Sequence, residues 1–82
     1  MLIEVLGLPD ERTAALEAAL AQALTRFGAG EHVSVRRIHD TGAMIARGVR
    51  TPPALRVDGR VVCRGRVPDV DEIRGYLDAA GT

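Results

Sequence analysis

The stretch PPALRVDGRVVC, residues 52–63, decides the fold of this chain. Two mostly apolar runs, residues 54–57 and 60–63, flank the dipeptide Asp58-Gly59. Asp-Gly between two such runs is the strongest short-range signal for a β-hairpin. The prolines at 52 and 53 cannot lie inside a helix, so the first strand of the hairpin is expected to begin directly after them. The stretch therefore predicts two antiparallel strands.

Upstream of the hairpin, the sequence alternates between strand patterns and helical patterns. Residues 2–6 form a short apolar run that Gly7 closes, which is typical of a buried strand. Residues 33–38 predict a second strand, and Asp40 or Thr41 can cap a short helix that ends at Gly48. Between these strands, an apolar stripe spaced by four, four and three residues predicts a helix that Gly28 ends. Its members are Leu16, Leu20, Leu24 and Phe27.

Downstream of the hairpin, Gly65 and Pro68 mark a loop, and Asp69 can cap a last helix. The positions of this helix that we expect to face inward are Val70, Ile73, Leu77 and Ala80. The predicted order is β-α-β-α-β-β-α, in which a right-handed crossover makes the first two strands parallel. We therefore predict an α/β fold in which a four-stranded mixed sheet carries helices on both faces.

Length and composition restrict the class of protein. The 82 residues leave room for one domain, residues 1–82, and 46% apolar residues argue against disorder. The cations, all arginine, and the acidic residues number eleven each, so we expect no nucleic-acid partner. Neither a membrane span nor a signal peptide stands out, and we expect a cytoplasmic protein without membrane contact. With one Phe and one Tyr the core is small, and forming a homodimer is one way to stabilise it.

Four short motifs carry a resemblance to a known family: residues 3–7, 48–55, 57–59 and 65–68. In their order and spacing they resemble the small bacterial and archaeal thioredoxin-like proteins, also called redox-active disulfide proteins. The resemblance covers nearly the whole chain and implies a thioredoxin-like fold with a cis proline at Pro53. In that family the residue before this proline offers its backbone N–H to an extended substrate. Pro52 has no N–H, so such docking would lose one hydrogen bond, worth about 1 kcal/mol.

The family's usual active-site motif is missing from the sequence. The family carries Cys-x-x-Cys between the first strand and the first helix, and the spacing to Leu16 puts those cysteines at Asp10 and Thr13. Dithiol exchange needs an attacking thiolate and a resolving thiol, and neither position supplies one. Asp10 is then either a helix cap or a fixed negative charge in the place of a thiolate. The resemblance thus implies the fold without dithiol oxidoreductase activity, and we expect a non-catalytic module that binds a protein or a small molecule.

Cys63 offers a first alternative, a monothiol redox or redox-sensing protein. As the single cysteine of the chain it excludes an internal disulfide. Arg64 and Arg66 are close in sequence, and their charges would favour a thiolate. The competing interpretation is a small apolar residue buried on an edge strand. A regular hairpin ladder would pair Cys63 with Ala54, on the face opposite Leu55.

The arginines offer a second alternative, a site for a small anionic ligand, since arginine binds carboxylate and phosphate groups. The cations near the predicted functional end of the sheet are Arg12, Arg47, Arg50, Arg64 and Arg66. A solvated arginine-rich surface is the competing interpretation. The residues expected to gather at this end of the sheet are Asp10, Thr13, His39, Asp40, Pro53, Cys63 and Arg64. We expect no cofactor and no metal, because the histidines and the cysteine lack ligand spacing.

Overall fold

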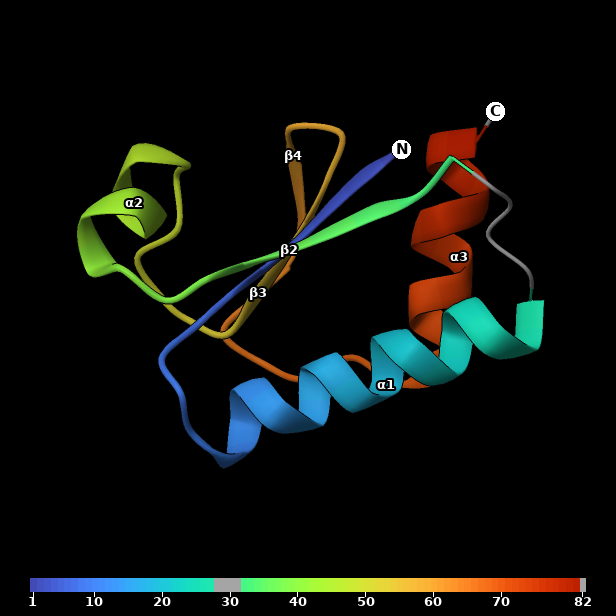
Figure 1. The fold of residues 1–82 in the computed structure, drawn as a ribbon, viewed down its shortest axis with the longest axis horizontal. Helices are drawn as coiled ribbons and strands as arrows, with labels where there is room; N and C mark the ends of the chain where they lie inside the picture. Colours follow the sequence, from blue (N-terminus) through green and yellow to red (C-terminus); the bar gives the residue numbers. More distant parts are fainter. Residues whose placement is uncertain (28–31, 82) are drawn as a thin grey trace.

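The computed structural model describes residues 1–27 and 32–81 of the chain, without the side chain of Phe27. Gly28, which was predicted to end the first helix, lies outside the described residues. The elements follow the predicted order (Figure 1): β1 Leu2–Leu6, α1 Glu11–Phe27, β2 Ser34–Ile38, α2 Thr41–Ala46, β3 Ala54–Val57, β4 Arg60–Arg64 and α3 Val70–Gly81.

The four strands form one mixed sheet in the order β2-β1-β3-β4. β1 runs parallel to β2, with Leu2 opposite Ser34 and Leu6 opposite Ile38. β3 runs antiparallel to β1 and to β4. Because β1 is an inner strand of the sheet, its residues from Ile3 to Leu6 are buried. The predicted fold class and sheet are confirmed.

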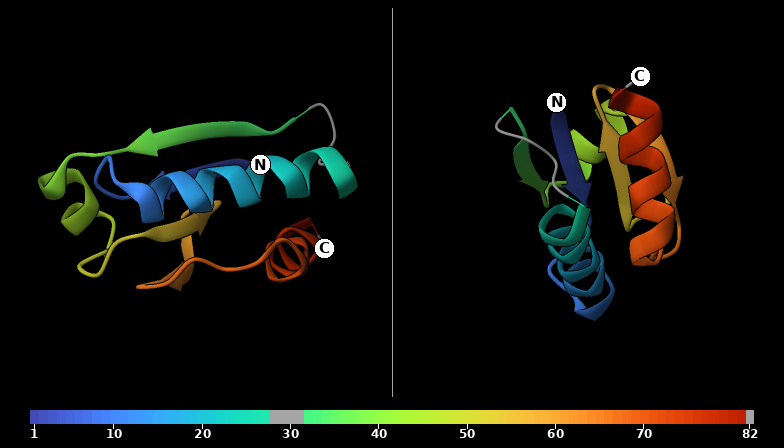
Figure 2. Two further views of the ribbon diagram at one scale, coloured as in Figure 1. Left: turned by 90° about the horizontal axis from the view of Figure 1, so that it is seen from below. Right: turned by 90° about the vertical axis from the view of Figure 1, so that its right-hand side faces the viewer.

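Helices cover both faces of the sheet, and each face has its own apolar cluster. Residues of α1 and α3 pack with Ile3, Val5 and Leu55 on one face. On the other face Met44 of α2 packs with Leu6, with Val49 of the loop before β3 and with Ala54 of β3. Figure 2 shows α1 and α3 together on one side of the strands. Among the described residues, no helix combines the length and the apolar character that a membrane crossing requires.

The Asp58-Gly59 turn joins β3 to β4 as predicted. Both residues have positive φ, 48° and 83°, as a tight two-residue hairpin turn requires. The turn is also tied to β1, because the backbone N–H of Asp58 donates to Leu2 O at 2.8 Å. The Asp58 carboxylate accepts the N–H of Leu2 at 2.7 Å. These bonds fix the hairpin against the inner strand.

The hairpin departs from a regular ladder by a β-bulge. Val57 faces Arg60 and Arg56 faces Val61, but Leu55 then faces Cys63, so Val62 is the extra residue. The predicted pairing of Cys63 with Ala54 is therefore wrong. The single extra residue moves Cys63 to the face of Leu55, because side chains alternate with a period of two along a strand.

Side chains cap the helices at the predicted positions. Asp40 caps α2, since its carboxylate accepts the N–H of Ala43 at 2.8 Å. Asp69 caps α3 by accepting the N–H of Glu72 at 2.8 Å. Ala80 was predicted to face inward but is exposed. The described residues of α3 after Leu77 are all exposed, because its last turn extends beyond the core.

Candidate functional site

The two positions at which the resemblance puts cysteines lie at the start of α1, one just before the helix and one in its first turn. Asp10 is exposed and caps the helix, since its carboxylate accepts the N–H of Thr13 at 2.9 Å. This hydrogen bond holds the pKa of Asp10 below its ordinary value. The carboxylate therefore stays charged at neutral pH and stabilises the helix start.

Thr13 is closed off from solvent. It is 1% exposed, and its Oγ1 has no hydrogen-bond partner among the described residues. The side chain packs against Gly7, where an added Cβ would lie 2.2 Å from Thr13 Oγ1. On the other side of Gly7, its carbonyl lies 2.7 Å from His39 Nδ1. Thr13 thus fills the space between α1 and the end of β1 and presents no accessible hydroxyl.

Cys63 lies in the core beneath α1 and α3. It is 7% exposed, and its thiol donates to Arg66 O, with 3.9 Å between Sγ and the oxygen. Tyr76 of α3 is its neighbour: burial first, and then the proximity of Cys63, raise the pKa of the Tyr76 hydroxyl. The guanidinium group of Arg66 pairs with the Glu72 carboxylate at 2.5 and 3.1 Å. Its charge is therefore balanced by Glu72 and is not left for an accessible thiolate.

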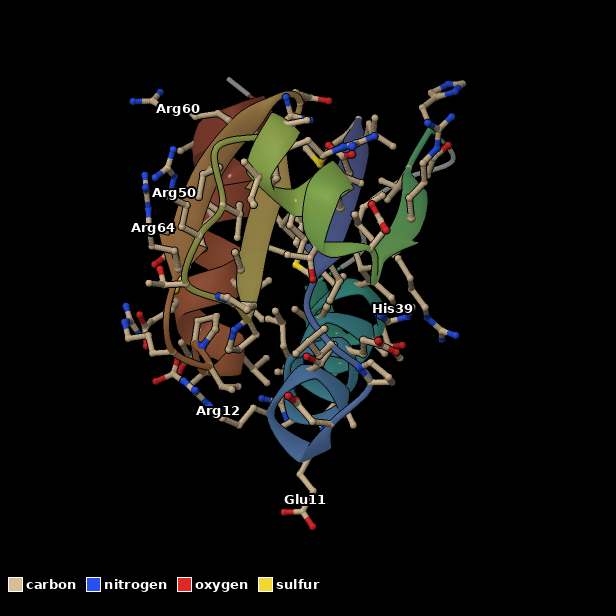
Figure 3. All side chains as sticks on the ribbon, turned by 90° about the vertical axis from the view of Figure 1, so that its left-hand side faces the viewer. Glu11, Arg12, His39, Arg50, Arg60 and Arg64 are labelled. Carbon is tan, nitrogen blue, oxygen red and sulfur yellow. The ribbon has the colours of Figure 1, made fainter. Side chains whose placement is uncertain are left out.

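The arginines of the predicted functional end have different environments. Arg12 donates to Gly65 O at 2.7 Å, and the N–H of Gly65 donates to Pro53 O at 2.9 Å, so α1, the loop after β4 and the start of β3 meet here. Arg47 and Arg66 are held in ion pairs with acidic residues. Arg50 and Arg64 are exposed and make no ion pair within the described part of the chain. Figure 3 shows both pointing outward on the same side of the molecule.

An apolar groove opens beside this end, between the loop after β1, helix α2 and the loop before β3. We call it the α2 groove, and its volume is about 480 Å³. Two of its side chains, Leu8 and Ile45, are large and apolar yet 46% and 51% exposed. The peptide bond between Pro52 and Pro53, in the loop that borders the groove, is cis, in agreement with the resemblance. The residues that line the groove are Leu8, Thr41, Met44, Ile45, Val49, Arg50 and Pro52.

Comparison with known proteins agrees with this architecture. A model of the thioredoxin-domain family matches residues 1–78. The chain belongs to the thioredoxin-domain family. No curated protein and no solved structure matches the chain significantly. This thioredoxin domain has a single cysteine and therefore no cysteine pair.

The structure brings together only part of the predicted site of the thioredoxin domain. Asp10, Arg12 and Pro53 meet at one end of the sheet through Gly65 and the start of α1. Cys63 is one residue from that end, and the bulge at Val62 turns its side chain to the face that α1 and α3 cover. Within residues 1–27 and 32–81, no three side chains of His, Cys, Asp or Glu form a group that could hold a metal ion.

Sequence reasoning missed one charged cluster, which we call the Glu4 clamp. Glu4 is 2% exposed in the inner strand β1, and its carboxylate accepts from Arg47 at 2.9 Å and from Arg56 at 2.6 Å. Burial raises the pKa of Glu4, but the two guanidinium groups outweigh it and hold the pKa below its ordinary value. An isolated acidic residue in a buried strand was the available signal, since such a charge needs a partner.

Proposed function

We propose that this thioredoxin domain is a non-catalytic binding module that uses the α2 groove rather than thiol chemistry. The observation that carries the proposal is that the thiol of Cys63 is buried, whereas apolar side chains of the α2 groove are exposed. The single thiol is 7% exposed beneath two helices, whereas Leu8 and Ile45 stand about half exposed in an open groove. Apolar side chains gathered in one concave place favour binding of a partner, because their burial is favourable.

The start of α1 supports the same proposal. If Asp10 and Thr13 occupy the positions of the family's two cysteines, the first has become a helix cap and the second a packing residue against Gly7. Neither can attack or resolve a disulfide. The chain then keeps the groove at this end of the sheet but lacks the two cysteines that disulfide exchange requires.

The other two hypotheses have less support. A monothiol protein needs an accessible thiolate, whereas Cys63 packs in the core cluster with Leu55 and Ile73. An anionic ligand has fewer arginines available than the sequence suggested, because Arg47 and Arg66 are used in ion pairs within the domain. Arg50 and Arg64 are the exposed cations that such a ligand would contact.

A disulfide-reduction assay tests the absence of exchange chemistry. With dithiothreitol and insulin, the protein is expected to give no turnover above the reagent alone. The Asp10→Cys/Thr13→Cys variant is the positive control, and it should gain turnover if those positions match the family's cysteines. Turnover by the unmodified chain that disappears in Cys63→Ser would contradict the proposal.

Selection of peptides from a random phage-displayed library tests the binding function. We expect enriched peptides whose binding is lost in Ile45→Asp, because a carboxylate in the groove cannot be buried against an apolar anchor. Val35→Asp is the matched control, since Val35 is 47% exposed but lies on β2, away from the α2 groove. Peptides that bind both variants equally would show that the groove is not the binding surface.

A further inference from the structure

The Glu4 clamp holds more positive than negative charge. The carboxylate of Glu4 accepts from Arg47 at 2.9 Å and from Arg56 at 2.6 Å, one arginine on each of its two oxygens. A single carboxylate therefore serves two guanidinium groups. No other acid in the described part of the chain pairs with either arginine, so one positive charge of the clamp is left unbalanced.

A third arginine lies in the same row of the sheet. Glu4 faces Arg36 of β2 in the parallel ladder and Arg56 of β3 in the antiparallel ladder. Residues directly opposite one another share a face of the sheet, so Arg36 lies on the face of the clamp. It is exposed and makes no ion pair within the described residues. We call Arg36, Arg47 and Arg56 the arginine site.

The elements around the arginine site bring no further acid. Strands β2, β3 and β4 and helix α2 contain no Asp or Glu, and Glu4 is the single acid of β1. Asp40 and Asp58, the described acids that adjoin these elements, each already accept a backbone N–H. Three guanidinium groups thus face one carboxylate, which leaves an excess of two positive charges.

The arginine site is accessible to solvent. Helix α2 has six residues and lies at one end of the sheet, whereas α1 and α3 cover the opposite face (Figures 1 and 2). The side chains of Arg47 and Arg56 are 31% and 24% exposed. Glu4 does not use all the donors of Arg56, since it accepts from Nη1 alone and Nε is buried without a partner. The arginines can therefore bind an anion from solvent in addition to Glu4.

We propose that the arginine site binds the phosphate group of a small phosphomonoester. Such a group carries a charge of about −1.5 to −2 at neutral pH and offers three acceptor oxygens, which matches two excess charges on three arginines. A carboxylate offers one charge and would leave the other unbalanced. Arginine also binds phosphate through pairs of parallel hydrogen bonds.

This site is separate from the proposed peptide-binding surface. None of its three arginines lines the α2 groove. Arg36 and Arg56 also lie outside the group of arginines that the sequence pointed to at the end of the sheet. The proposal therefore adds a second binding site to the domain and does not depend on the function proposed for the groove.

The positive charge is confined to one row, which favours a small ligand over a polyanion. The chain as a whole has no net charge, whereas polyanions are bound by extended basic surfaces. The neighbouring rows of β1, β2 and β3 on the same face are uncharged, and consist of Leu2 with Ser34, and of Leu6 with Ile38 and Ala54. We therefore expect recognition of a single phosphate group.

Titration with glycerol 3-phosphate at constant ionic strength, followed by proton–nitrogen correlation spectra, tests the site. We expect saturable shifts of the Nε–H signals of the arginine site. Arg36→Gln should raise the dissociation constant at least about fivefold, because it removes a charge-assisted contact from an exposed position. Arg37→Gln is the matched control and should change the constant less than about twofold. Arg37 is the next residue of β2, but it lies on the face of α1 and pairs with Glu17.

Other anions at the same ionic strength test the class of ligand. Inorganic phosphate should bind within about threefold of glycerol 3-phosphate, whereas acetate and chloride should bind at least about tenfold more weakly. A phosphoserine peptide should bind no more tightly than glycerol 3-phosphate, because the site recognises the phosphate group alone.

Glu4→Gln tests the charge balance from the opposite direction. It removes the carboxylate that repels the ligand, so glycerol 3-phosphate should raise the melting temperature of this variant more than that of the unmodified domain. The ligand would then restore part of the stability that the variant loses. Sodium chloride at the same ionic strength is the control for general screening.

Four results would overturn the proposal. They are shifts that do not saturate or that chloride reproduces, equal effects of Arg36→Gln and Arg37→Gln, acetate binding as tight as phosphate binding, and a melting-temperature gain in Glu4→Gln no larger than in the unmodified domain. A phosphoserine peptide that binds at least about tenfold more tightly than glycerol 3-phosphate would also overturn it, and would assign the site to a phosphorylated protein.

Discussion

Glu4 joins three elements of the domain through two ion pairs that share its carboxylate. Its carboxylate lies in β1 between Arg47 from the end of α2 and Arg56 from β3. The three groups come from separate elements, and the carboxylate is 2% exposed while the guanidinium groups are partly solvated. The clamp therefore ties α2 to the sheet by charge as well as by the apolar contacts of Met44.

Removing the Glu4 charge is expected to destabilise the domain. Glu4→Gln should lower the free energy of unfolding by about 2–3 kcal/mol, because it leaves two arginines facing each other without a counter-charge. Urea denaturation measures the change. Glu17→Gln is the matched control, since the Glu17–Arg37 pair lies at the surface and should contribute less than about 1 kcal/mol. Equal losses in the two variants would contradict the clamp.

Gly7 and Thr13 form a second residue-scale test. Gly7→Ala should destabilise the domain by about 1–3 kcal/mol, because its new Cβ meets Thr13 Oγ1 in a packed site. In the background of Thr13→Ala the same change should cost less than half as much, since that hydroxyl is gone. Denaturation of the two single variants and the double variant gives the coupling energy. Additive losses would show that Thr13 does not fill the space beside Gly7.

At the scale of elements, α3 and the bulge of β4 together bury the thiol. The bulge turns Cys63 to the face that α1 and α3 cover, and α3 begins directly after the loop whose Arg66 carbonyl contacts the thiol. The start of α3 is fixed by Asp69, which caps it, and by the Arg66–Glu72 pair, whose hydrogen bond lowers the pKa of Glu72. Access to Cys63 should therefore depend on the opening of α3 more than on α2.

Weakening the caps tests this dependence. Asp69→Ala should cost about 1 kcal/mol and raise the alkylation rate of Cys63 in the folded protein about fivefold. Asp40→Ala removes the comparable cap of α2 on the opposite face and should change that rate much less. Iodoacetamide labelling followed by mass spectrometry measures both rates. Equal increases would mean that the thiol is exposed by global unfolding rather than by α3.

The elements were predictable from the sequence because their signals are local. The Asp58-Gly59 turn, the Asp69 cap and the prolines before β3 each depend on a few neighbouring residues. The bulge was not predictable, because residues 61 and 62 are both valine and no glycine or other local signal in β4 marks an extra residue. The Glu4 clamp was missed for a related reason. Glu4 lies about forty and fifty residues from its two partners along the chain, and the fold alone brings them together.

For the whole molecule, the shifted pKa values predict stability that falls on the acid side. Glu4, Asp10 and Glu72 all have a lowered pKa in the folded state. Their contribution is present above the unfolded values, 3.8 for Asp and 4.5 for Glu, and is lost as pH falls through the lower folded values. Thermal melting between pH 2 and 7 measures this decline. In Glu4→Gln the decline should be shallower, and an unchanged slope would contradict the role given to Glu4.

The pKa of Tyr76 is shifted in the opposite direction, upward, and affects stability at alkaline pH. Its raised pKa means that the partly buried, neutral hydroxyl stabilises the fold below the ordinary value of 10.0, and that this contribution is lost as pH rises above it. Tyr76→Phe should make the alkaline decline of the melting temperature shallower, because no phenolate then has to form in the core. An identical decline in both proteins would show that the pKa of Tyr76 is not raised in the folded state.

The most direct test of the central claim is the accessibility of the single thiol. Cys63 in the folded protein should react with iodoacetamide more than about tenfold more slowly than in urea-unfolded protein, at every pH where the fold persists. This result would leave the domain without an accessible thiol for redox chemistry. A folded protein that reacts as fast as the unfolded chain would contradict the claim, and Cys63 would then be the functional residue.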